Sequence, residues 1–409
     1  MAQAEIDSSY SWVRLGISVL AGTMSCIGLW AAVLVLPNVQ AEFDVSRGGA
    51  SLAYTLAMVG FGLGNVYLGR LVDRHGIAPV LAGAAIVLSV SFALSALVNS
   101  MMLFALLQFP IGLATAAGFG PLIADISHWF MKRRGIAVAA TAAGNYFAGA
   151  LWPLALKDVI AENGWRPAFI TVSIFCVVVL LPIAWMLRRR IGAVPSSGTK
   201  GAIPDQPVKS IDLSHRTLLI LLAIAGVGCC VAMSMPQVHI VAYCADLGFG
   251  TGVGAEMLST MLGAGIISRL LSGFLADRFG GIYTLLIGSV LQCLALFLYI
   301  PFNGLASLYI VSLVFGLSQG GIIPSYAIII REYMPAAQAG QRVGFVIMAT
   351  VMGMALGGWL SGLIYDLTGS YQAAFLNGIA WNVMNIAIMV FILMRSRPAR
   401  PAADKLATA

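Results

Sequence analysis

The sequence predicts an all-α membrane protein in which twelve spanning helices form two six-helix halves. Of its 409 residues, 60% are hydrophobic and only 10% are charged, whereas soluble domains carry about 25% charged residues. Twelve apolar stretches are each long enough to cross about 30 Å of hydrocarbon as a helix. A loop motif also recurs at half the length of the chain, which indicates a duplicated unit. This composition excludes a soluble multidomain enzyme.

The twelve expected spans follow one another with short connections, and helices are required because an open strand in lipid would leave backbone groups unpaired. Their approximate ranges are 12–37, 48–71, 77–98, 101–127, 135–157, 166–188, 216–244, 253–276, 281–301, 304–331, 341–365 and 371–394. The polar stretch 189–215 is rich in Pro, Gly, Ser and basic residues, which predicts a cytoplasmic linker. We therefore expect a first half at 1–188, a second half at 216–394 and a cytoplasmic tail at 395–409.

The distribution of basic residues predicts the orientation. If the amino terminus is cytoplasmic, 19 of the 23 Lys and Arg residues lie on the cytoplasmic side. Only Arg47, Lys157 and Arg166 lie outside, and Arg269 lies within a span. This asymmetry is typical of a bacterial-type cytoplasmic (inner) membrane protein with both termini in the cytoplasm. The net charge of +7 is explained by this orientation, so no nucleic-acid partner is expected.

The repeated motif lies after the second and the eighth span. Segment 69–76 reads GRLVDRHG and segment 273–280 reads GFLADRFG, at an offset of 204 residues. In such a turn the aspartate can lie beside the N-terminus of another helix, where the dipole favours an anion. The arginine can pair with an acid at the inner end of the fourth or tenth span. The candidate residues for inner gating are therefore Asp73, Arg74, Asp277, Arg278, Asp125 and Glu332.

The paired motif, the twelve spans and the central basic linker together resemble the major facilitator superfamily. More narrowly, segments 129–135 (WFMKRRG) and 164–169 (GWRPAF), with an arginine inside the eighth span, resemble the monocarboxylate transporter family and the bacterial oxalate–formate exchangers. The resemblance implies an alternating-access carrier for small monocarboxylates such as lactate or pyruvate. Animal relatives carry a lysine and an aspartate where this chain has Asn38 and Gly265. Proton symport and anion exchange therefore both remain open.

Arg269 is the main candidate for substrate binding. It lies about two helical turns from the inner motif, and an intramembrane charge costs at least a few kcal/mol unless it faces a wet cavity or a partner. We expect its guanidinium to bind a carboxylate through two parallel hydrogen bonds. The alternative is a structural arginine that caps a helix end or bridges carbonyls. A single cation suits a monoanion, and the repeat equivalent of Arg269 is the neutral Asn65.

Other polar residues inside the spans are further candidates for substrate contact. They are Asn145, Tyr146, Gln237, His239, Gln319 and Tyr326. For each of them, an interhelical hydrogen bond is the alternative role. His239 is the only histidine within an apolar run, so it either titrates during transport or is a neutral, hydrogen-bonded imidazole.

Several other functions were weighed against carboxylate transport. A carrier of aromatic or larger organic acids, or an exporter of drug-like compounds, uses the same architecture. A sensor that signals through the linker is a third alternative. No nucleophile–base set or metal cluster favours an enzyme, and no charged ring favours a channel. The expected partners are a small carboxylate, a proton or counter-anion, and the lipid bilayer; we expect a monomer without metal or cofactor.

Overall fold

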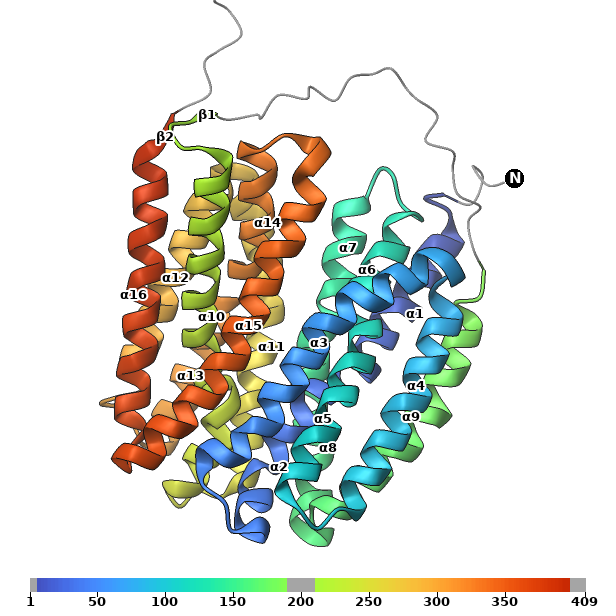
Figure 1. The fold of residues 1–409 in the computed structure, drawn as a ribbon, viewed down its shortest axis with the longest axis vertical. Helices are drawn as coiled ribbons and strands as arrows, with labels where there is room; N and C mark the ends of the chain where they lie inside the picture. The colour runs from blue at the N-terminus through green and yellow to red at the C-terminus, as the bar shows by residue number, and fades with distance from the viewer. Residues whose placement is uncertain (1–5, 190–209, 398–409) are drawn as a thin grey trace, which may run out of the picture.

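A computed structural model of the chain describes residues 6–189 and 210–397, which are almost entirely helical. The helices before the linker are α1 (Ser9–Ser25), α2 (Ile27–Phe43), α3 (Arg47–His75), α4 (Ile77–Leu97), α5 (Met101–Thr115), η2 (Ala116–Gly118), α6 (Gly120–Ser127), α7 (Arg134–Ala142), α8 (Gly144–Asn163) and α9 (Trp165–Met186). Those after it are α10 (His215–Asp246), α11 (Thr251–Phe279), α12 (Gly281–Leu298), α13 (Leu305–Gln319), α14 (Ile322–Tyr333), α15 (Ala336–Thr368) and α16 (Tyr371–Arg395). Figure 1 shows the two groups on opposite sides of the molecule.

The helices confirm the expected membrane bundle. Eleven segments of the described chain are long and apolar enough to span a membrane. The twelfth expected span, at 135–157, corresponds to α7 and α8, which are separated at Ala143. The expected linker at 189–215 lies mostly outside the described residues, as does most of the tail expected at 395–409.

Four of the spans are interrupted. α1 and α2 are separated at Cys26, α7 and α8 at Ala143, and α13 and α14 at Gly320 and Gly321, while the short 3-10 helix η2 separates α5 from α6. A helix end leaves backbone groups without intrahelical partners. At membrane depth such groups are tolerated only when they are buried in protein or line a cavity. Backbone groups that the interruptions leave unpaired therefore need partners within the bundle.

The half-length repeat extends from the sequence into the packing. A Cβ atom added at Gly112 would lie 1.9 Å from the carbonyl oxygen of Ala57, and one at Gly316 would lie 2.1 Å from that of Met261. Both members of each pair are related by the same offset of 204 residues as the loop motif. The two glycines let α5 approach α3, and α13 approach α11, at equivalent places in the two halves.

The last glycine of each motif copy ends a helix. Gly76 follows α3 with φ 80°, and Gly280 follows α11 with φ 86°. L-residues with a side chain rarely adopt this conformation, so glycine is required there. In each half the next helix begins at the following residue. The motif thus reverses the chain without an intervening loop.

A short antiparallel ribbon joins the end of the linker to the start of the tail. Strand β1 (Ser210–Ile211) pairs with β2 (Ser396–Arg397), and Arg395 lies 3.7 Å from Asp212. The sequence analysis did not predict this ribbon. It lies on the same side of the bundle as the start of α1 (Figure 1). We call this side, where a cytoplasmic location is expected, the linker side, and the opposite side the far side.

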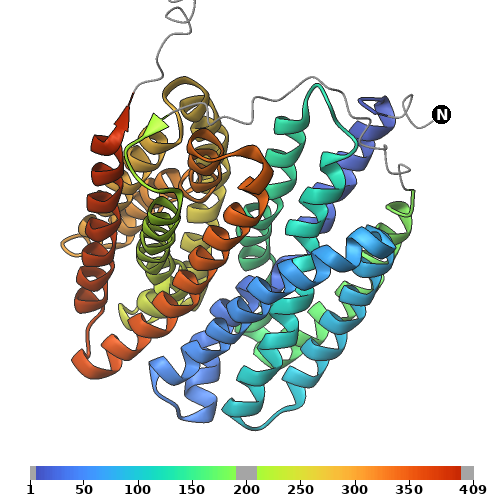
Figure 2. The same cartoon turned by 45° about the horizontal axis from the view of Figure 1, so that its top comes forward.

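The two halves meet along α3 with α15 and along α8 with α11. Between them lies a cavity of about 720 Å³, lined by the linker-side parts of α3, α6, α7, α14 and α15. Figure 2 shows the two groups of helices spread apart toward this side. We call this space the linker-side cavity. The molecule is therefore open toward the linker side.

The close contact at Gly112 predicts a selective loss of stability. Gly112→Ala forces α3 and α5 apart, and overpacking of this kind costs about 1–3 kcal/mol. We expect the thermal unfolding midpoint of the purified protein to fall. Gly83→Ala is the matched control, because nothing lies within 4 Å of a Cβ atom at that helical position. Equal midpoints for the two variants would show that the α3–α5 contact does not limit stability.

Candidate functional site

Arg269 of α11 lies between the halves, at the ends of two interrupted helices. Its Nη1 donates a hydrogen bond to the carbonyl oxygen of Ala142 at 2.8 Å, and its Nε donates to that of Gly320 at 3.4 Å. Ala142 ends α7 in the first half, and Gly320 follows α13 in the second. Helix C-termini carry unpaired carbonyls and partial negative charge, so they stabilise a cation. The guanidinium also lies 4.5 Å from the ring centroid of Tyr146.

A pair of hydrogen-bonded glutamines lies beside Gly265, one helical turn before this arginine. Nε2 of Gln237 donates to Oε1 of Gln319 at 2.5 Å, which joins α10 to α13. A Cβ atom at Gly265 would lie 2.8 Å from the ring of Tyr146 and 3.5 Å from Nε2 of Gln319, so glycine is needed for this packing. We call Tyr146, Gln237, Arg269 and Gln319 the central polar cluster. Oε1 of Gln237 is buried without a hydrogen-bond donor among the described residues.

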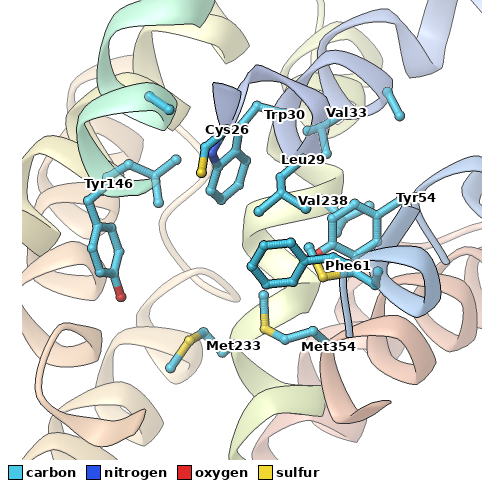
Figure 3. Packing of buried hydrophobic residues seen from close by; sticks show 14 of the residues in the cluster. Cys26, Leu29, Trp30, Val33, Tyr54, Phe61, Tyr146, Met233, Val238 and Met354 are labelled. Carbon is cyan, nitrogen blue, oxygen red and sulfur yellow. The ribbon is translucent and has the colours of Figure 1, made fainter. Parts of the chain in front are cut away.

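Apolar side chains lie near Tyr146 of the central polar cluster. Figure 3 shows Tyr146 on one side, with Trp30 above it and Met233 below, and with Phe61 and Met354 on the opposite side. All five side chains are less than 10% exposed. A low local dielectric among these side chains would strengthen the attraction between Arg269 and a bound anion.

Three other expected substrate ligands are engaged in different contacts. The indole of Trp30 donates to the carbonyl oxygen of Asn145 at 3.3 Å, while the Oδ1 atom of Asn145 is buried without a donor among the described residues. The hydroxyl of Tyr326 donates to Asn385 at 3.0 Å within the second half. Both ring nitrogens of His239 are used, by the hydroxyl of Tyr371 and the carbonyl of Gly358. The contacts of Tyr326 and His239 match the interhelical role, and a substrate role for either stays a prediction.

Arg47 closes the far side between the two halves. Its Nη2 lies 3.1 Å from Asp246, and its Nη1 donates to the hydroxyl of Tyr371 at 2.6 Å. The carboxylate of Asp366 accepts from the backbone N–H groups of Arg47 and Gly48, at 2.8 and 2.7 Å. A carboxylate of α15 thereby caps the N-terminus of α3, where the helix dipole favours an anion. Arg47, Asp246, Asp366 and Tyr371 form what we call the far-side closure.

A second ion pair crosses the halves on the far side. Lys157 of α8 pairs with Glu256 of α11, and the hydroxyl of Tyr309 donates to the same carboxylate at 2.6 Å. The sequence analysis did not select these residues or the far-side closure. A signal was present, because Arg47 and Lys157 are two of the three basic residues expected outside. The third, Arg166, pairs with Glu42 within the first half.

The linker-side motif residues are arranged differently from the expectation. Asp73, Arg74, Asp277 and Arg278 are exposed, and none forms an ion pair with another described residue. The expected pairing of the motif arginines with Asp125 and Glu332 is therefore absent from these contacts. Asp125 and Glu332 instead contact other groups.

Asp125 pairs with Arg14, which is fully buried, at 2.7 Å. Arg14 also donates to the carbonyl oxygen of Leu187 and lies over the ring of Trp129, so it ties α1, α6 and α9 together. Glu332 accepts from the backbone N–H of Gly281 at 3.3 Å. At the N-terminus of α12 the expected carboxylate is thus that of Glu332. The side chain of the motif aspartate, Asp277, is exposed.

Asn65, the repeat equivalent of Arg269, contacts an interrupted helix in the first half. Its Oδ1 accepts from the backbone N–H of Gly120 at 3.0 Å, at the start of α6. Each residue thus satisfies backbone groups at a break in the fourth helix of its half. Asn65 accepts at a helix N-terminus, whereas Arg269 donates at a helix C-terminus, so only the second half places a cation at the centre.

The family profile described as Major Facilitator Superfamily matches residues 18–281 and 246–408. The chain belongs to the Major Facilitator Superfamily. This transporter is 27% identical to human monocarboxylate transporter 11, over 90% of this chain and 80% of the relative. It is also 22% identical to the Agnestins efflux protein AgnL12 of Paecilomyces divaricatus, over 79% and 73% of the two chains. The relatives therefore include both monocarboxylate transporters and efflux proteins.

Solved structures of superfamily transporters share the fold. A bacterial homologue of the human lysosomal transporter Spinster, in an inward-facing and unoccupied conformation, matches with a TM-score of 0.70 at 13% identity, covering 95% of this chain and 96% of that one. The nucleoside transporter NupG matches with a TM-score of 0.73 at 13% identity, covering 93% and 99%. At this identity the matches support the fold alone.

The far-side closure predicts how the transporter opens. Arg47→Gln removes charged hydrogen bonds, each worth about 1.5–3 kcal/mol, so opening on the far side should become roughly tenfold more frequent or more. Opening can be measured with a cysteine introduced as Ser51→Cys, because Ser51 is buried where α3 meets α15. The measured quantity is the rate at which this cysteine reacts with a thiol reagent. The background carries Cys293→Ser, which removes a partly exposed native cysteine.

Arg166→Gln is the matched control, because it removes a far-side ion pair that lies within one half. We expect no acceleration in this control. Equal labelling rates of Ser51→Cys with and without Arg47→Gln would contradict the role given to Arg47.

Proposed function

We propose that this transporter moves small monocarboxylate anions, such as lactate or pyruvate, by alternating access, with Arg269 binding the carboxylate. The observation that carries the proposal is the position of Arg269 between the halves. Its guanidinium is oriented by carbonyl groups from both halves, and no carboxylate among the described residues contacts it. The neutral carbonyl groups orient the guanidinium of Arg269 but do not neutralise its charge, which remains available to a ligand. The two oxygens of a carboxylate match the planar geometry of the guanidinium.

The central polar cluster suits a small hydroxy acid. Oε1 of Gln237 is a buried acceptor that lacks a donor among the described residues. A substrate hydroxyl can supply this donor, because an unpaired buried acceptor costs about 1–3 kcal/mol. Tyr146 and Gln319 add neutral polar groups, while the apolar residues around them suit the short hydrocarbon part of the substrate.

Charge compensation supports coupling to a proton or to a counter-anion. An empty carrier must reorient with the charge of Arg269 enclosed among apolar residues, whereas a bound monoanion neutralises it. Net transport of the anion alone would move charge across the membrane potential, at about 2.3 kcal/mol per 100 mV. A co-transported proton removes this cost. We therefore propose proton coupling, with anion exchange as the alternative.

A second candidate function is the transport of aromatic or larger organic acids. It is favoured by the volume of the linker-side cavity, about 720 Å³, and by the apolar residues near the central polar cluster. The presence of efflux proteins among the relatives also supports this candidate. In either case we propose a monomer in the cytoplasmic membrane with both termini in the cytoplasm. The distribution of basic residues supports this orientation.

Counterflow in proteoliposomes tests the proposal. Vesicles loaded with unlabelled lactate should accumulate labelled lactate, and an inward proton gradient should drive net uptake. Arg269→Ala should lower the rate by about 30- to 4000-fold, because truncating a buried charged partner costs about 2–5 kcal/mol. Arg269→Lys keeps the charge but loses the fork, so an intermediate rate is expected.

The matched control is Arg216→Gln, which removes an exposed linker-side arginine. It should transport like the unmodified protein. Full counterflow of every carboxylate by Arg269→Ala would refute the role of Arg269. Counterflow of benzoate without that of lactate would favour the second candidate.

A further inference from the structure

His239 is joined to the far-side closure through one hydroxyl group. Its Nε2 lies 2.8 Å from the carbonyl oxygen of Gly358, and its Nδ1 lies 3.1 Å from the hydroxyl of Tyr371. The same hydroxyl lies 2.6 Å from Nη1 of Arg47, which belongs to the first half. A chain of three hydrogen bonds therefore connects α15, α10 and α16 of the second half with the N-terminus of α3.

The direction of each hydrogen bond in this chain is fixed by its partners. A carbonyl oxygen only accepts, so Nε2 of His239 carries the proton and donates to Gly358. A guanidinium only donates, so the oxygen of Tyr371 accepts from Arg47. The single proton of that hydroxyl is then donated to Nδ1 of His239. The closed far side is thus built around a neutral imidazole whose Nδ1 is an acceptor.

A proton on Nδ1 of His239 would disrupt this chain. A protonated imidazole has no acceptor nitrogen, so the hydroxyl of Tyr371 would lose the acceptor of its proton. Its oxygen would then face two cationic donors, Arg47 at 2.6 Å and His239 at 3.1 Å, which repel each other. His239 is also fully buried, and a buried charge loses its hydration. An imidazolium therefore weakens the far-side closure.

Three charged groups act on His239 from the surrounding helices. They are Arg47 of α3, Asp246 of α10 and Asp366 of α15. The two aspartates favour an imidazolium, but each has a partner of its own. Asp246 pairs with Arg47, and Asp366 accepts from two backbone N–H groups of α3. Neither aspartate replaces the acceptor that Tyr371 would lose.

The other titratable groups on this side do not change charge with the imidazole. The far-side acids of α2 and α11, which also pack against α10, form the ion pairs Glu42–Arg166 and Glu256–Lys157. The charged residues of α14 and α16 lie in their last turns, on the linker side. Tyrosine in water titrates only near pH 10; the tyrosines around this chain of hydrogen bonds are Tyr54, Tyr243, Tyr365 and Tyr371.

We propose that His239 is a proton-binding site through which the pH on the far side controls the far-side closure. When the far side opens, water reaches the imidazole and supplies a proton. Because the imidazolium opposes closure, a falling pH shifts the population toward the open arrangement. The proton must leave before the far side closes, so it regulates opening and is not carried with the substrate. The inference rests on the alternating access of the proposed function, but not on Arg269 or on the identity of the substrate.

The distance between two spin labels tests this inference on the purified full-length protein without substrate. The labels are attached at Leu97→Cys, exposed at the end of α4, and at Leu367→Cys, exposed near the end of α15. The background carries Cys293→Ser. Histidine in water titrates near pH 6.5, so the ratio of open to closed molecules should rise about tenfold between about pH 7.5 and about pH 5.5.

Three variants assign this pH response. His239→Gln removes the titrating group and should abolish the response. His215→Gln is the matched control, because it removes an exposed histidine at the start of the same helix, and it should keep the full response. Tyr371→Phe keeps His239 but removes the hydroxyl between it and Arg47, so the response should become smaller. This variant tests the inference even if His239→Gln lowers the thermal unfolding midpoint.

Equal pH responses in His239→Gln and His215→Gln would overturn the inference. Lack of any response in the unmodified protein, or an undiminished response in Tyr371→Phe, would also overturn it. Arg47→Gln separates the inference from the proposed function, because it should lengthen the distance between the labels at every pH. If Arg47→Gln opens the far side and acidification does not, the proton site fails and alternating access stands. If neither opens it, alternating access fails as well.

Discussion

An arginine inside the hydrocarbon region must be surrounded by oxygen atoms, and much of this transporter is arranged to meet that requirement. Arg269 obtains them from the ends of α7 and α13, one in each half. Continuous helices would have used those carbonyls internally. The interruptions at Ala143 and Gly320 are therefore what allows a full positive charge to lie between the halves. The duplicated fold places an interrupted helix beside Asn65 as well, but a neutral amide satisfies it there.

Arg269 also connects the site to the relative position of the halves. Its bond to Ala142 crosses from the second half to the first, so the guanidinium that is proposed to hold the substrate also holds the two halves in contact. A carboxylate that competes for Nη1 would weaken this contact, which gives the substrate differential affinity for two arrangements of the halves. The far-side closure opposes opening on the other side with a separate set of contacts, centred on Arg47.

The spans and the duplication could be predicted from the sequence because they depend on local composition and on a repeated motif. The importance of Arg269 also followed from its isolation in an apolar run. Its two carbonyl contacts match the alternative role, a bridge between helix ends, and its role in substrate binding stays a prediction. The partners of charged residues could not be predicted, because they depend on helix packing. Asp125 was expected near a motif arginine, yet the first span brings Arg14 to it instead. Nothing local to Asp366 indicates that its carboxylate will cap α3, more than 300 residues away in the chain. The pairing of Gln237 with Gln319 likewise arises only when α10 meets α13.

The central claim is that Arg269 recognises the negative charge of the substrate. The most direct measurement is a cycle that compares the binding of lactate and of neutral lactamide to the unmodified protein and to Arg269→Gln. If the guanidinium binds the carboxylate, the preference for lactate over lactamide should fall by about 30-fold or more in the variant, as expected for a coupling of at least 2 kcal/mol. An unchanged preference would show that Arg269 only bridges helix ends, and that the anion is recognised elsewhere.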